Sequence, residues 1–284
     1  MKKTSCLLAL LFSIPSLFCG AQSTPATANH SSNASDHATG AIADPGYMSA
    51  LKDPKRIVTL SFREPNYTDL AKNFTEADLP AFCEVLNDED SPYMHKDKAL
   101  ELIACLAITN RDAAVDRLVD FMKRPVKWDK QTANTRWAVE NVLAKNRAVM
   151  AISKVGGDKS EAILKQLITP EGAREVAKDW ISGWPADNAY GNQQEVLGGL
   201  RGAAAYELAR NKANWELVQT EYARERQACI ESGKPSHYLS GLISGMGLID
   251  TIKEVGTLPD PRVPSLLMKN IEKYQLPAAA PKTP

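Results

Sequence analysis

Apolar residues recur along the middle of the chain at intervals of three and four positions. This spacing places side chains on one face of an α-helix, whereas a half-buried strand would alternate. Four stretches follow it: Leu79, Phe82 and Leu86; Ala99, Leu102, Ile103 and Leu106; Val115, Leu118, Val119 and Met122; Ile163, Leu164, Leu167 and Ile168. The pattern predicts an all-α protein.

Start and stop signals bound these helices. Capping boxes are expected at Thr75 with Asp78 and at Asp158 with Glu161, and N-caps followed by proline at Thr169-Pro170 and Asp260-Pro261. Glycines mark the ends: Gly156-Gly157, Gly183, Gly233 and Gly256. Residues 57–62 alone look like a strand. Because Asp53-Pro54 can start a helix there, we expect a helix or an irregular segment.

Three segments resemble one another along the chain. Residues 79–86 align with 115–122 at a period of about 36 residues, and with 161–168 after about 46 more, which brackets the length of a two-helix repeat. The first copy continues through the acidic turn of Asp88 and Asp90 into an Ala/Leu ladder over residues 99–107, with Lys96 or Lys98 at its start.

This first copy resembles a HEAT repeat, in which helix A ends in a short acidic turn and helix B carries such a ladder. The resemblance covers residues 75–168. It implies a HEAT-like α-solenoid of stacked helical hairpins, because each hairpin can bury its apolar faces only against its neighbours. The period fades after residue 170, so we expect a C-terminal helical cap or bundle there.

Four glycines occupy helix interiors in that second half. Gly198 and Gly202 lie in one predicted helix, and Gly241 and Gly245 in another. A glycine in a helix interior costs about 1 kcal/mol relative to alanine. The pattern therefore predicts that the two helices pack with their backbones in close contact.

The amino-terminal residues are typical of a secretory signal peptide. Lys2 and Lys3 precede an apolar stretch, and small residues end at Ala21, so residues 1–21 are interpreted as a cleaved leader. In the alternative interpretation Cys19 receives a lipid anchor. Either route exports the protein to the periplasm or the cell exterior. Residues 22–46 and 277–284 are predicted to be a disordered tether and tail around a repeat domain at 47–276.

Composition narrows the function. The chain has 284 residues with 34 basic and 34 acidic side chains, a balance that argues against nucleic-acid binding. No apolar run is long enough for a transmembrane span. Of five cysteines, three follow the leader. Cys83 and Cys105 fall in neighbouring helices and either pair or remain separate buried thiols, the second being favoured.

Few residues indicate chemistry. The four histidines lack metal-ligand spacing, so no metal or other cofactor is expected. Residues 230–233, with Gly245-Met246-Gly247 further on, resemble the Glu-Ser region of lytic transglycosylases. The resemblance implies that Glu231 is a buried general acid that cleaves peptidoglycan. Asp250 replaces the glutamine of that pattern.

Two tryptophans are the candidate binding residues. Trp180 and Trp184 flank a predicted helix end, where side chains are expected to reach solvent and contact a protein or peptide. The sequence thus favours an exported, non-catalytic binding or scaffolding protein with a partner in the cell envelope. A transglycosylase-type enzyme acting through Glu231 is the alternative.

Overall fold

The structure is a computed structural model that describes residues 49–61, 65–106, 108–126, 136–184, 192–232, 237–259 and 265–275. Within these ranges the secondary structure is entirely helical, which confirms the all-α prediction. The predicted leader, tether and tail, with Cys19, lie outside the described residues, as do the signals expected at Gly233 and Asp260-Pro261.

The helices divide into short ones at the amino-terminal end and longer ones beyond them. The α-helices are α3 (Pro54–Ile57), α4 (Tyr67–Ala71), α5 (Leu79–Asn87), α6 (Tyr93–Cys105), α7 (Arg111–Lys123), α8 (Arg136–Val155), α9 (Asp158–Leu167), α10 (Pro170–Ile181), α11 (Gln193–Ala209), α12 (Trp215–Ser232), α13 (His237–Val255) and α14 (Ser265–Glu272). Two 3-10 helices, η2 (Glu76–Asp78) and η3 (Lys212–Asn214), precede α5 and α12.

Most start signals act as predicted. Asp53 caps α3, which begins at Pro54, so the strand-like run begins in a helix and a turn. Thr75 forms its capping box with Asp78, and the Thr169 hydroxyl accepts the Gly172 amide at 3.1 Å.

The capping box predicted at Asp158 is wrong. The N-cap of α9 is Gly157, and Asp158 is the first helical residue. Gly156 and Gly157 both have positive φ, 72° and 92°, so the chain reverses within two residues of the end of α8. Helix α9 therefore begins at Asp158, whereas a side-chain cap at Asp158 would require it to begin at residue 159.

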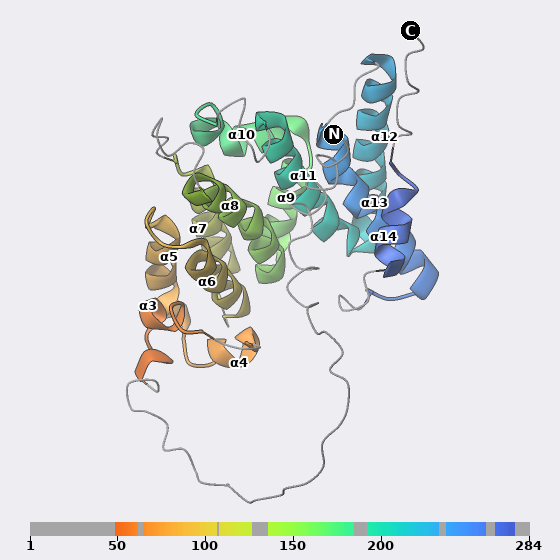
Figure 1. Cartoon of the computed structure of the whole chain (residues 1–284). Helices are drawn as coiled ribbons and strands as arrows, with labels where there is room; N and C mark the ends of the chain where they lie inside the picture. The colour runs from red at the N-terminus through yellow and green to blue at the C-terminus, as the bar shows by residue number, and fades with distance from the viewer. Residues whose placement is uncertain are drawn as a thin grey trace, which may run out of the picture.

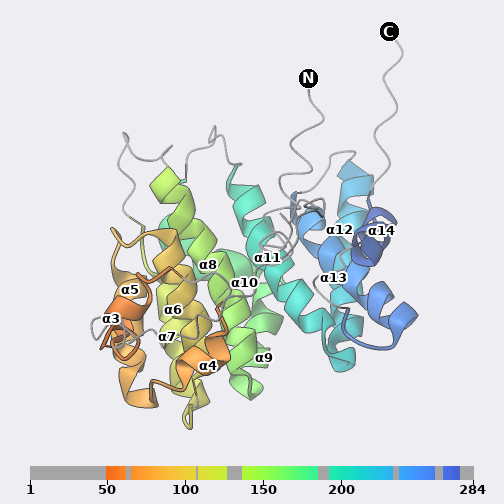
Figure 2. The same ribbon diagram turned by 60° about the horizontal axis from the view of Figure 1, so that its bottom comes forward.

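The chain runs from α3 at one end of the molecule to α14 at the other (Figures 1 and 2). One row consists of α6, α8, α11 and α13, each packed against the next. On its other side α5 packs against α7, and α7 against α10. The apolar faces meet between these rows in a continuous core, where Leu102 and Leu118 are 1% and 0% exposed.

The predicted close contact between two glycine-bearing helices is confirmed. A Cβ atom added to Gly202 would lie 2.8 Å from the Cα atom of Gly241, and one added to Gly241 would lie 2.1 Å from the carbonyl oxygen of Gly198. In the same way, a Cβ atom added to Gly245 would lie 2.9 Å from the carbonyl oxygen of Ala205. The backbones of α11 and α13 therefore touch over several turns, and no larger residue fits at Gly241.

Helix α13 is the centre of the carboxyl-terminal part. It packs against α11, α12 and α14, and its residues 241–249 are all buried. Ile271 of α14 packs directly against Gly247. A Cβ atom added to Gly247 would lie 2.5 Å from the Cγ1 atom of Ile271. The arrangement explains why the repeat period fades after residue 170, since these helices surround a central one.

The described part of the chain also bears on the membrane and disulfide expectations. No helix there is both long and apolar enough to cross a bilayer. Cys83, Cys105 and Cys229 of the described residues are free thiols, which confirms the favoured interpretation that Cys83 and Cys105 do not pair. Cys83 is buried as expected, whereas Cys105 is only half-buried.

We expect Gly241→Ala to lower the free energy of unfolding by more than about 2 kcal/mol, because the new methyl group must push α11 and α13 apart. Denaturant titration followed by circular dichroism measures the change. The matched control is Gly199→Ala on α11, whose added Cβ meets only the amide end of the Asn146 side chain, at 2.9 Å. Equal losses in both variants would contradict a special role for the glycine contact.

Candidate functional site

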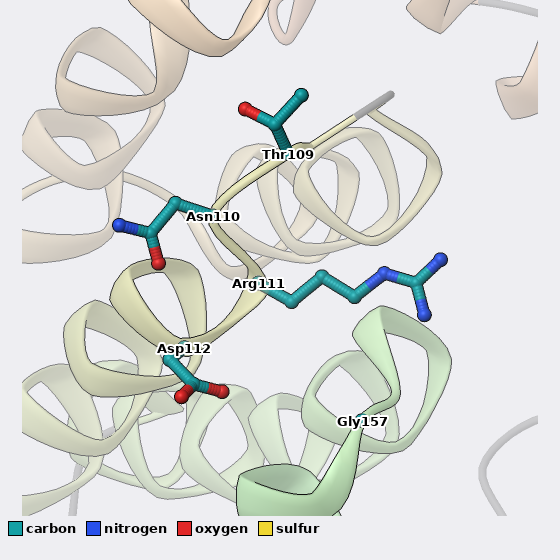
Figure 3. Close-up of a pocket in the computed structure, with 5 residues that line it drawn as sticks. All are labelled: Thr109, Asn110, Arg111, Asp112 and Gly157. Carbon is teal, nitrogen blue, oxygen red and sulfur yellow. The ribbon is translucent and has the colours of Figure 1, made fainter.

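A surface cavity of about 460 Å³ lies where two helix turns meet. Its lining comes from the start of α7 and from the turn between α8 and α9: Thr109, Asn110, Arg111, Asp112 and Gly157 (Figure 3). The cavity is thus built from two segments more than 40 residues apart in sequence, and all the side chains in its lining are polar.

Residues 109 and 110 form one wall of the cavity, and hydrogen bonds to Glu76 of η2 fix their position. The Glu76 carboxylate accepts the Thr109 hydroxyl at 2.5 Å and the Thr109 and Asn110 amides at 3.1 and 3.3 Å. These hydrogen bonds, led by the one from the Thr109 hydroxyl, lower the pKa of Glu76. Asn110 in turn caps α7 by accepting the Ala113 amide.

Arg111 is the cationic group of the cavity. Its side chain extends toward the turn at Gly157 (Figure 3). The Cδ atom of Arg111 would lie 4.0 Å from a Cβ atom added to Gly157. The guanidinium makes no hydrogen bond or ion pair with the described residues, and the adjacent α9 has no side-chain N-cap. With Asp112 nearby, the cavity offers donors and an acceptor suited to polar groups of a ligand.

Trp180 and Trp184 do not reach solvent, contrary to the prediction. Trp180 is 1% exposed and Trp184 is 3% exposed. Trp180 lies on the face of α10 that packs against the carboxyl end of α7, and its indole Nε1 donates to the Met122 carbonyl at 2.9 Å. Both side chains are part of the core.

Lys145 of α8 completes the same buried cluster. Its ammonium donates to the carbonyls of Phe121, Met122 and Arg124 at 2.8, 3.2 and 2.8 Å. It also lies 5.4 Å from the centre of the Trp180 ring. Burial, together with the nearby positive charges of Lys96 and Arg124, lowers the pKa of Lys145 to about 7.

Glu231 lies at the carboxyl end of α12, where it is exposed and accepts a hydrogen bond from the Gln227 amide at 2.8 Å. A glycosidase acid needs an environment that keeps it protonated, usually an apolar one. The exposed position of Glu231 does not provide that environment, so the geometry does not support the role that the resemblance implied.

No group of three or more potential metal ligands occurs among the residues that the structure describes. Comparisons with protein-family models, with curated proteins and with solved structures found no match to this chain. Its function is therefore inferred from its own residues.

Sequence reasoning missed the residues of the cavity. The sequence signals the parts separately, since Asn110 is a typical N-cap and Gly156-Gly157 a typical helix end. Nothing in the spacing places residue 111 beside residue 157. That neighbourhood depends on how the hairpin of α7 and α8 packs against α9.

We expect Lys145→Met to destabilise the protein by about 1–3 kcal/mol at neutral pH, because the buried carbonyls of Phe121 and Met122 and the part-buried carbonyl of Arg124 lose their donor. The difference should widen as pH rises. The pKa of Lys145 is lower in the folded state, about 7, than in the unfolded state, so the unfolded chain binds more protons above pH 7 and the wild type gains stability there. Denaturant titrations from pH 6.5 to 9.5 measure both effects, and a gap that narrows with pH would contradict this assignment.

Proposed function

We propose that the protein is an exported, non-catalytic binding or scaffolding module built on HEAT-like helical repeats, with a protein or peptide partner in the cell envelope. The observation that carries the proposal is the row of α6, α8, α11 and α13 backed by α5, α7 and α10. Stacked hairpins of this kind present long, rigid surfaces suited to other chains.

A recurring contact supports the repeat interpretation. Three helices of that row each direct a basic side chain at the carboxyl end of an earlier helix. Lys98 of α6 donates to the Val58 and Leu60 carbonyls after α3, and Lys145 of α8 donates to the last carbonyls of α7. Arg201 of α11 donates through Nε to the Ile168 carbonyl after α9, at 2.7 Å. The three contacts share one chemistry, a basic side chain that donates to carbonyls at a helix end, and this similarity is what supports the repeat interpretation.

The cavity at Arg111 is the candidate contact point for the partner. It lies at the hairpin ends, where loops vary without disturbing the stack. Its guanidinium is available to a carboxylate or a backbone carbonyl of a bound chain. The ligand class that fits the cavity is therefore an extended or loop segment with an acidic or carbonyl group at its centre.

The test is capture of envelope proteins by the tagged mature protein, followed by affinity measurement on the purified partner. We expect Arg111→Glu to weaken binding at least about tenfold, because a donor becomes a repelling charge. Arg117→Glu on the same helix makes the same charge change away from the cavity and should bind as the wild type does. Equal affinities for the wild type and Arg111→Glu would remove the cavity from the proposal.

A peptidoglycan zymogram tests the enzymatic alternative. We expect no clearing by the mature protein, and no difference between it and Glu231→Gln, because Glu231 is exposed. Clearing by the wild type that is lost in Glu231→Gln would overturn the proposal of a non-catalytic module.

A further inference from the structure

Glu207 is a carboxyl group enclosed between two helices. It belongs to α11, and its side chain is 1% exposed. It faces Ser153 near the end of α8, at the contact that joins the amino-terminal hairpins to the carboxyl-terminal bundle. Glutamate is almost never fully buried unless it is paired.

The pairing of Glu207 is incomplete. Its Oε2 atom accepts a hydrogen bond from the Ser153 hydroxyl at 2.8 Å and a longer one from Nη1 of Arg210 at 3.4 Å. Its Oε1 atom is buried and has no hydrogen-bond partner among the residues that the structure describes. An ionised carboxylate accepts at both oxygens, so this arrangement leaves half of the charged group unsatisfied.

Nearby cations compensate only in part. Arg210 is itself 41% exposed, which weakens its attraction for the carboxylate, and Lys154 is bound to Glu101 at 2.6 Å. Burial is the largest influence and raises the pKa of Glu207, against the smaller lowering effects of Arg210, Ser153 and Lys154.

Tyr206, the neighbour of Glu207 in the chain, does not supply a compensating charge either. Tyr206 stays neutral through the physiological range, because burial and the negative charge of Glu207 raise the pKa of its phenol. On α9, Lys159 pairs with Asp116 at 2.6 Å, and α13 presents Gly245 against Ala205 of α11.

We propose that Glu207 makes the contact between α8 and α11 sensitive to pH. In its neutral form the carboxyl group donates its proton from Oε2 to the Ser153 oxygen, which can accept as well as donate. Ionisation removes that proton and leaves a charge with one unsatisfied oxygen in the interface. The contact is therefore tight in mildly acidic solution and loosens as pH rises.

The direction of the effect follows from proton linkage. A carboxyl group whose pKa is higher in the folded than in the unfolded state contributes stability that is fully present below the unfolded pKa. That contribution is lost as pH rises through the folded pKa. Each unit of difference between the two pKa values corresponds to a tenfold change in the equilibrium for opening the contact.

Hydrogen exchange of the full mature chain tests the proposal. Protection factors, corrected for the intrinsic pH dependence of exchange, are measured from pH 4.5 to 8.5 for amides near Ser153 and Glu207. We expect protection in the wild type to fall across this range, tenfold for each unit by which the pKa of Glu207 is higher in the folded than in the unfolded state. That fall should be absent in Glu207→Gln, because an amide keeps a donor for Ser153 and cannot ionise. The pH dependence that comes from other groups, such as Lys145, is common to both proteins, so the difference between the two profiles reports Glu207.

Two further measurements complete the test. Glu231→Gln, at an exposed glutamate, is the matched control and should keep the pH dependence of the wild type. Carbon-13 NMR of the wild-type Glu207 carboxyl should give a pKa above the ordinary glutamate value. A pKa at or below that value, or equal pH dependence in the wild type and Glu207→Gln, would overturn the proposal.

Discussion

The rest of the structure depends on one constraint: where a helix ends inside the protein, its last carbonyls need hydrogen-bond donors. The last carbonyls of a helix have no donor within it, and a buried carbonyl without a partner is costly. Lys145 supplies three donors at the end of α7, and Arg201 supplies one after α9. Each such side chain brings a charge into the core, so Arg201 is also paired with Glu225 and Glu221, at 3.1 and 3.4 Å.

The carboxyl-terminal part solves its packing differently. There α11 and α13 meet through glycines, with an added Cβ at Gly202 only 2.7 Å from the Gly241 carbonyl oxygen. Helical glycines lower the intrinsic stability of both helices, and dense contact of the backbones compensates for that loss. A long cationic side chain such as Lys145 or Arg201 tolerates small shifts of the backbone because it can follow its acceptors, whereas the glycine contact admits almost none.

The sequence predicts the local helical structure well. It predicts contacts between helices only where a residue type is suited to few environments. The apolar faces containing Leu102 and Leu118 and the glycines of α11 and α13 are such cases, and the structure confirms them. The prediction for Trp180 is wrong because an indole suits a surface or a core equally, and only the position of the Met122 carbonyl decides between them. The neighbourhood of Arg111 depends on tertiary packing that no local pattern encodes.

The helices capped by cations and the helices packed through glycines meet between α8 and α11. The polar side chains at this contact are only partly hydrogen-bonded. Asn146, like Glu207, has a buried side-chain oxygen that finds no hydrogen-bond partner in the described part of the chain, and its amide nitrogen faces Gly199 of α11. Polar groups that are only partly satisfied weaken an interface more than apolar residues of the same size would. Since the glycine contact is rigid and the amino-terminal hairpins are held by their own caps, strain or a change in charge should be relieved first at this contact.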